Sequence, residues 1–172
     1  NEVVRHFVRL SQMNYNIDRG FYPLGSCTMK YNPKINEDVA ALPAFNSIHP
    51  HQPESTVQGC LEVIWEIERI LCEVTGLAAV TAQPAAGSHG EFAGILMMRK
   101  YHESKNSDRK VILIPDSAHG TNPSSVSIAG YKTVEIKSND KGTINLDDFK
   151  SKLTGDVAGL MVTNPNTLGF FE

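Results

Sequence analysis

One segment whose residue types suggest chemistry combines two glycines with a serine and a histidine. Gln83–Glu91 reads QPAAGSHGE and stands at the start of a helical pattern. The first backbone N–H groups of a helix have no partner within it and lie at its positive dipole end, so they can bind a phosphate. Ser88 and Glu91 also fit a capping box, which needs no ligand. Because no P-loop or G-x-G-x-x-G fingerprint is present, the segment alone leaves both interpretations open.

A second polar segment, Pro115–Pro123, carries a histidine in the sequence PDSAHGTNP. An imidazole after a strand can stack on a planar heteroaromatic ring and can move protons, which makes His119 a candidate catalytic residue. A structural hydrogen bond is the alternative role for this histidine. Capping by Thr121 or Asn122, with Pro123 at the first helical position, explains the neighbouring residues without a ligand.

Two further segments collect polar groups on loops. Thr163–Gly169 reads TNPNTLG, and Thr163 or Asn164 could donate a hydrogen bond to a phenolate-type oxygen, although a simple turn is also sufficient. Arg19–Pro33 collects hydroxyls, the Cys27 thiol and cations between Gly and Pro residues, a density that suggests binding. No histidine adjoins Cys27, so thiol catalysis is disfavoured.

His49 and His51 could in principle share a metal ion. No further ligands follow them in a suggestive pattern, and the segment fits a surface loop better. The sequence therefore predicts no metal site.

Alternating helical and strand-like patterns must position these segments. Apolar spacing near the helical period also marks residues 3–13, and a loop rich in Gly, Pro and Asn follows to about Pro53. The remaining pattern predicts helices over residues 54–74, 88–101, 123–129 and 146–153, the first ending at Gly76 and the last capped by Asn145, and strands over residues 78–82, 111–114, 132–137 and 157–163. This order favours a largely parallel sheet whose ligands gather at the carboxyl ends of the strands, after Thr81, Ile114 and Val162.

Composition is that of an ordinary globular domain. The 172 residues are 41% hydrophobic and 20% charged, and a net charge of -3 offers no basic field for nucleic acid or membranes. Three cysteines without a CxxC pair, and no signal-like opening segment, favour the cytoplasm. The sequence starts at Asn1 and stops at Glu172 just after an apolar run, which we interpret as a portion of a longer polypeptide.

The segment Pro23–Pro33, PLGSCTMKYNP, resembles the signature of the P-protein family of the glycine cleavage system, glycine dehydrogenase (decarboxylating). The three loop segments above resemble that family in the same order, so the resemblance covers nearly the whole chain. With His89 and Phe92, the chain is more similar to subunit 2 of the split bacterial enzyme than to the fused form.

This resemblance implies an α/β fold: a partial three-layer, mostly parallel sheet of a type I pyridoxal-phosphate-dependent transferase (aspartate aminotransferase-like) large domain, preceded by a helical and loop arm. The implied domains are an arm over residues 1–53 and a partial pyridoxal-phosphate-binding large domain over residues 54–172, truncated before the Schiff-base lysine. The family decarboxylates glycine through pyridoxal 5'-phosphate and passes the aminomethyl group to the lipoyl arm of H-protein. Implied partners are glycine, H-protein and P-protein subunit 1, within an oligomer.

By motif position, the resemblance also assigns residues. Phosphate binding falls to Gly87, Ser88 and His89, ring stacking to His119, contact with the phenolic oxygen to Thr163 and Asn164, and substrate binding to Ser26, Thr28 and Lys30. No segment matches the family's lysine motif, so we expect the chain alone to be inactive. Another fold-type-I enzyme and a non-catalytic phosphate-binding α/β module are the alternatives, and the arm motif argues against the first.

Overall fold

Two units make up the chain in the computed structural model, which describes residues 1–16, 20 and 31–172. Unit 1 is Asn1–Ala82 and unit 2 is Gln83–Glu172. The division into an arm over residues 1–53 and a cofactor-binding region over residues 54–172 stays a prediction. None of the helices in the described ranges combines the length and the apolar character that crossing a bilayer requires.

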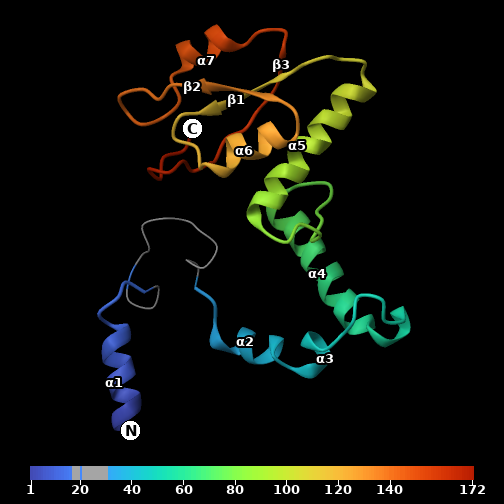
Figure 1. Cartoon of the computed structure of the whole chain (residues 1–172), viewed down its shortest axis with the longest axis vertical. Helices are drawn as coiled ribbons and strands as arrows, with labels where there is room; N and C mark the ends of the chain where they lie inside the picture. The colour runs from blue at the N-terminus through green and yellow to red at the C-terminus, as the bar shows by residue number, and fades with distance from the viewer. Residues whose placement is uncertain (17–19, 21–30) are drawn as a thin grey trace. The chain divides into compact units, whose positions relative to one another are not determined.

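The regular elements in the described part of unit 1 are all helices (Figure 1). They are α1 (Glu2–Ser11), α2 (Lys34–Ala40), α3 (Pro43–Asn46), the 3-10 turn η1 (Glu54–Thr56) and α4 (Gln58–Thr75). The expected helix ending at Gly76 is confirmed as α4, because Gly76 has a left-handed φ of 70° and its N–H donates to Cys72 O at 2.9 Å. The short helices α2 and α3 lie in the region where we expected only a loop.

The strand expected over residues 78–82 is wrong, since the structure assigns no strand to this segment. The backbone N–H of Ala82 donates instead to Glu68 Oε1 at 2.7 Å. Alanines offer little apolar area, and a strand is stable only beside another strand that shares its hydrogen-bond ladder. An apolar run of this length therefore did not establish a strand.

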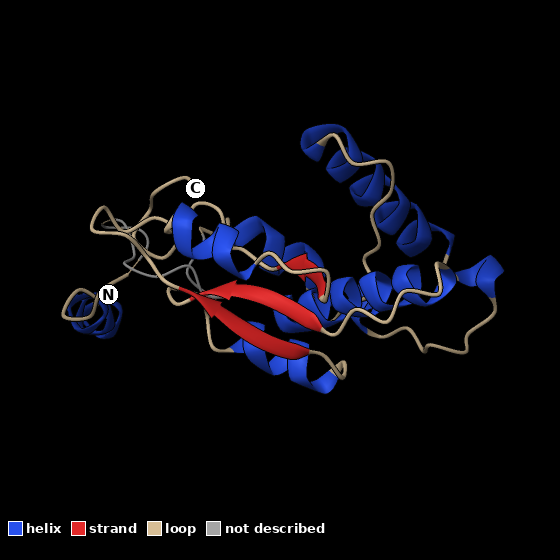
Figure 2. Ribbon diagram, turned by 90° about the horizontal axis from the view of Figure 1, so that it is seen from above, coloured by secondary structure: helices blue, strands red, loops and turns tan. Residues whose placement is uncertain are grey.

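Unit 2 is an α/β unit built on a three-stranded parallel sheet in the order β2-β1-β3. Figure 2 shows its strands pointing the same way. Its elements are α5 (Gly87–Ser104), β1 (Val111–Pro115), α6 (Thr121–Ile128), β2 (Lys132–Ile136), α7 (Leu146–Lys152) and β3 (Val157–Leu160). Each of these six elements was expected from the sequence, although β3 is shorter than its apolar run.

The alternation of side chains along β1 creates the three layers of unit 2. Ile112 and Ile114 pack against α5 and α6 on one face, and Leu113 faces the α7 side with Phe149. Figure 1 shows α6 and α7 on opposite sides of the strands. Ile112 and Leu113 are fully buried, and burying such a side chain stabilises the fold by about 1.5–3 kcal/mol. The expected partial three-layer α/β fold is confirmed.

A glycine turn and a helix cap connect β2 to α7. Gly142 has a φ of 79°, in the left-handed region where glycine is favoured, and its N–H donates to Asn139 O at 2.9 Å. Asn145 caps α7, with its Oδ1 accepting from the N–H groups of Asp147 at 3.0 Å and Asp148 at 3.1 Å.

Candidate functional site

The loops that leave the carboxyl ends of the three strands are bonded to one another. After β1, the Asp116 carboxylate accepts hydrogen bonds from the hydroxyl and the backbone N–H of Ser138, the latter at 2.9 Å. These bonds, from a residue just beyond β2, hold the pKa of Asp116 below its ordinary value. After β3, Thr167 Oγ1 donates to Ser117 O at 2.8 Å. The structure thus gathers these loops at one edge of the sheet, where parallel α/β folds bind ligands.

The N-terminal end of α5 presents unused backbone donors. Ala86 is the extended N-cap residue, and the N–H of Gly90 is the first to bond back, to Ala86 O at 3.1 Å. The N–H groups of Gly87, Ser88 and His89 donate to no other described residue. A Cβ added at Gly87 would meet nothing within 4 Å, so the space in front of this turn is open. Such a donor set suits a phosphate group.

The capping box that Ser88 and Glu91 could have formed is excluded, because α5 begins earlier and Ser88 lies inside it. Glu91 instead accepts hydrogen bonds from Thr121 Oγ1 at 3.1 Å and Ser125 Oγ at 3.4 Å, both on α6. This carboxylate therefore joins the first turn of α5 to the first turn of α6. Sequence analysis missed this role, since the local motif explained Glu91 without any distant partner.

His119 lies between β1 and α6, with an exposed ring. Its Nδ1 is 2.8 Å from Thr121 Oγ1 and 3.2 Å from Thr121 N. The helix start expected at Pro123, with Thr121 or Asn122 as cap, is wrong: α6 begins at Thr121, and Gly120 is an N-cap without a side-chain bond. Because the Thr121 hydroxyl does not cap the helix, it can form hydrogen bonds with His119 and Glu91. Stacking by His119 stays a prediction.

Thr163 and Asn164 are exposed after β3. Asn164 Oδ1 accepts from the N–H of Glu172 at 3.1 Å, and its Nδ2 donates to no other described residue, which leaves a donor for a ligand. The same turn is organised by Asn166, which is only 7% exposed.

Asn166 Nδ2 donates to Gly142 O and to Glu172 Oε1, both at 2.8 Å. Its Oδ1 accepts from the N–H groups of Leu168 at 3.0 Å and Phe170 at 3.2 Å. Sequence analysis missed this role, although an asparagine that bonds the N–H two residues on is a recognised turn signal.

The remaining candidates divide between two cases. Ser26, Thr28, Lys30 and Cys27 lie outside the described residues, so their roles stay predictions. His49 Nδ1 accepts from the N–H of His51 at 3.1 Å, which occupies one of the two ring nitrogens that could bind a metal. Within the described ranges, no three His, Cys, Asp or Glu side chains form a group that could hold a metal ion.

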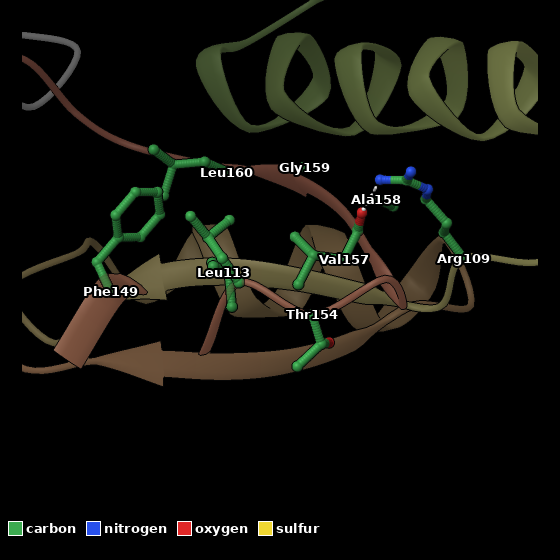
Figure 3. Close-up of a pocket in the computed structure, with 9 residues that line it drawn as sticks. Arg109, Leu113, Phe149, Thr154, Val157, Ala158, Gly159 and Leu160 are labelled. Carbon is green, nitrogen blue, oxygen red and sulfur yellow. Dashed lines mark hydrogen bonds between the residues drawn. The ribbon is translucent and has the colours of Figure 1, made fainter. Parts of the chain in front are cut away.

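A pocket between α7 and β3 lies away from this set of residues (Figure 3). Its wall is mainly apolar, with Leu113, Phe149 and Leu160 among its lining residues. The one cation there, Arg109, donates through Nη1 to Val157 O at 2.7 Å. None of the sequence-predicted site residues lines this pocket, and it is not part of the candidate site.

Comparison with known proteins finds close relatives of the chain. No protein-family model matches the chain. It is 60% identical over 172 residues to probable glycine dehydrogenase (decarboxylating) subunit 2 of Chlorobium phaeovibrioides, covering all of this chain and 36% of that protein. The chain is a homologue of this protein. Proteins of the same name from Chloroherpeton thalassium and Caldanaerobacter subterraneus are 59% and 58% identical, and the chain spans only 35% and 36% of their lengths.

A solved structure confirms the fold. The chain superposes with a TM-score of 0.73 on a crystal structure of glycine decarboxylase (P-protein) of the glycine cleavage system in inhibitor-bound form. The match covers 99% of this chain and 38% of the other, at 23% identity. The homologue of glycine dehydrogenase subunit 2 described here therefore has the fold of the corresponding part of a P-protein.

Proposed function

We propose that this chain forms part of the pyridoxal-phosphate-binding domain of a glycine dehydrogenase (decarboxylating), the P-protein of the glycine cleavage system. The observation that carries the proposal is the bridge through Glu91, which accepts from Thr121 and Ser125. It sets the unused N–H groups at the start of α5 beside the loop that holds His119. Whole-chain identity of 60% with a subunit 2 sequence supports the same conclusion.

The residues at this edge fit the cofactor by the chemistry of their donors. The N–H groups of Gly87, Ser88 and His89 would hold the phosphate, whose charge at a helix N-terminus is stabilised by about 0.3–1 kcal/mol. The exposed ring of His119 would stack on the pyridine ring. Pyridoxal 5'-phosphate, when bound, supplies the electron sink that makes loss of carbon dioxide from glycine possible.

Two residues after β3 would orient the ring within its plane. Thr163 carries a hydroxyl donor, and Asn164 retains its Nδ2 because Glu172 uses the amide oxygen. Either would donate to the phenolic oxygen, which fixes the side of the ring that faces the substrate. Ser26, Thr28 and Lys30 of the arm would bind glycine.

The activity of the whole protein belongs to the proposal. It would decarboxylate glycine and pass the aminomethyl group to the lipoyl arm of H-protein, in an oligomer with P-protein subunit 1. For the 172-residue chain by itself we expect no glycine decarboxylation and no glycine–carbon dioxide exchange. Turnover measured with the isolated chain would contradict this expectation.

Calorimetric titration with pyridoxine 5'-phosphate tests cofactor recognition. This probe lacks the aldehyde, so it cannot react with the lysines of the chain and reports recognition alone. We expect it to bind more tightly than either pyridoxine or inorganic phosphate. Pyridoxine lacks the phosphate that the N–H groups of α5 would hold, and inorganic phosphate lacks the ring on which His119 would stack. Replacing the stacking ring in His119→Ala should weaken binding roughly two- to thirteenfold, which corresponds to about 0.5–1.5 kcal/mol of aromatic contact.

His6→Ala is the matched control, because His6 is an exposed histidine of α1 in unit 1. It should bind the probe as the unchanged chain does. Equal affinity for inorganic phosphate and pyridoxine 5'-phosphate, unaffected by His119→Ala, would favour a phosphate-binding module without pyridoxal chemistry. Absence of binding by all three probes would overturn the proposal.

A further inference from the structure

Three side chains form a continuous hydrogen-bonded series where α5 and α6 begin. Glu91 Oε1 lies 3.1 Å from Thr121 Oγ1, which lies 2.8 Å from His119 Nδ1. Glu91 and Thr121 are half-buried between the two helices, whereas His119 is exposed at the end of the series. A carboxylate that is held within the fold thus reaches the exposed imidazole through one hydroxyl.

The single hydrogen of the Thr121 hydroxyl decides how the series is protonated. If the hydroxyl donates to Glu91, then Nδ1 of His119 must carry a hydrogen and donate to Thr121 Oγ1. If it donates to Nδ1 instead, two oxygen acceptors face each other at 3.1 Å with no hydrogen between them. An ionised carboxylate is a stronger acceptor than a neutral imidazole nitrogen, which favours the first arrangement.

One contact favours the second arrangement and has to be weighed. The backbone N–H of Thr121 points at Nδ1 from 3.2 Å, and it loses that acceptor when Nδ1 is protonated. This N–H is in the first turn of α6, where backbone donors ordinarily go to solvent or to a ligand. Losing this long hydrogen bond from a neutral backbone donor costs less than leaving the half-buried Glu91 carboxylate facing a hydroxyl whose hydrogen points away from it.

We infer that Glu91 is a positioning residue that acts through Thr121 to keep the Nδ1-protonated tautomer of His119 and to fix its ring plane. The hydrogen bond that one ring nitrogen makes determines which nitrogen carries the hydrogen. In the neutral ring, Nε2 is then left with a lone pair and can act as an acceptor. The use of this ring at a bound cofactor rests on the proposed function, whereas the tautomer does not.

Nuclear magnetic resonance of the ¹⁵N-histidine-labelled chain measures the tautomer directly. Long-range ¹H–¹⁵N spectra at about pH 8.5, where an unperturbed imidazole is neutral, distinguish Nδ1–H from Nε2–H rings. The His119 signals are assigned by their loss in His119→Gln. We expect Nδ1–H as the major form in the unchanged chain, and a shift to mainly Nε2–H, which free imidazole side chains prefer, in Glu91→Ala and Thr121→Val.

Two further variants separate positioning from packing. Glu91→Gln keeps an acceptor oxygen for the Thr121 hydroxyl and should retain most of the Nδ1–H form. Ser125→Ala removes the other hydroxyl that contacts Glu91, at 3.4 Å, without touching the series, and should leave the tautomer unchanged. Unaltered signals of the other five histidines show that each variant is folded.

Nε2–H as the major form in the unchanged chain would overturn the inference, and so would an equal shift in Ser125→Ala. Thr121→Val decides the matter if Glu91→Ala disturbs the other histidine signals. Failure of the proposed function gives a different result, because pyridoxine 5'-phosphate would then not bind while the tautomer pattern stayed as expected.

Discussion

Units 1 and 2 both carry amphipathic helices, yet among the described residues only those of unit 2 form a buried core. Every buried residue in the described ranges lies in unit 2, on α5, α6, the three strands or the loops between and after them. In unit 1, Phe7 of α1 is 63% exposed and Trp65 of α4 is 59% exposed. Helical spacing of apolar residues therefore predicts that a helix forms, but it does not predict which surface will bury the apolar face of that helix.

A sheet accounts for the contrast. In unit 2 the side chains of β1 alternate between two faces, and each face is covered by a helix. The described residues of unit 1 contain no sheet against which its helices could pack. Its helix α1 has only 10 residues. Isolated helices this short are marginal in water, so we expect α1 to contribute less to stability than the packed helices of unit 2.

The largest effect expected from this comparison is the loss of a core side chain. Ile112 is fully buried between β1 and the helices α5 and α6, and Ile112→Ala should lower the free energy of unfolding by about 2–5 kcal/mol. Urea denaturation followed by circular dichroism measures the loss. Ile67→Ala on α4 is the control, because Ile67 is 44% exposed and should cost less than about 1 kcal/mol. Similar costs at both positions would remove the distinction between the units.

A buried amide gives the next largest effect. The buried side chain of Asn166 makes four hydrogen bonds within unit 2, and Asn166→Ala would remove all four. We expect a loss of about 1–3 kcal/mol in the free energy of unfolding, measured by the same denaturation.

Asn32 of unit 1 is the counterpart of Asn166. It also bonds through both amide atoms, to Glu37 and Asn36, but it is exposed. Asn32→Ala should therefore change the free energy of unfolding by no more than about 0.5 kcal/mol. A cost for Asn32→Ala equal to that of Asn166→Ala would show that burial does not set the difference.

Helix capping also differs between the units, and the stronger cap is again in unit 2. Asn145 accepts two backbone bonds at the start of α7, whereas Asn1 precedes α1 without a side-chain cap. Asn145→Ala should cost about 1 kcal/mol, seen as a lower thermal midpoint. Asn1→Ala should leave the midpoint unchanged, and a comparable decrease there would mean that capping is not what the substitution removes.

The sequence predicted those parts of the fold that local pattern controls. The strand at residues 111–114, the Asn145 cap and the glycine stop of α4 each depend on a few neighbouring residues, and the structure confirms all three. The same local information suggested a strand at residues 78–82, where the outcome depends on a neighbouring strand that the pattern does not reveal. Element type was thus predictable wherever its cause was local.

The candidate site shows the same limit. The loop segments around Gly87, His119 and Asn164 were identified from residue type, since small and polar residues after strands are typical of binding loops. The partners of Glu91 were not, because Thr121 and Ser125 lie 30 and 34 residues further along the chain. A tertiary hydrogen bond of this kind competes with a local motif, and the motif alone does not show which one forms.

The smallest expected effect is electrostatic and depends on pH. Hydrogen bonds from Ser138 hold the pKa of Asp116 below its unfolded value, so the ionised carboxylate stabilises unit 2 above about pH 4. That contribution is lost as the pH falls through the lowered folded pKa. Because Asp116 is exposed, Asp116→Asn should cost less than about 1 kcal/mol at neutral pH.

Denaturation at a series of pH values tests the sign of this effect. The stability of the unchanged chain and of Asp116→Asn should converge as the pH falls from about 4 through the lowered folded pKa of Asp116, below which both side chains are neutral. Asp38→Asn is the control in unit 1, since the Asp38 carboxylate bonds to no other described residue, and its difference from the unchanged chain should stay near zero throughout. A difference in unfolding free energy between the unchanged chain and Asp116→Asn that persists or widens in acid would contradict this prediction. It would mean that the charge of Asp116 is not what the Ser138 hydrogen bonds stabilise, and that the two units do not differ in this electrostatic effect.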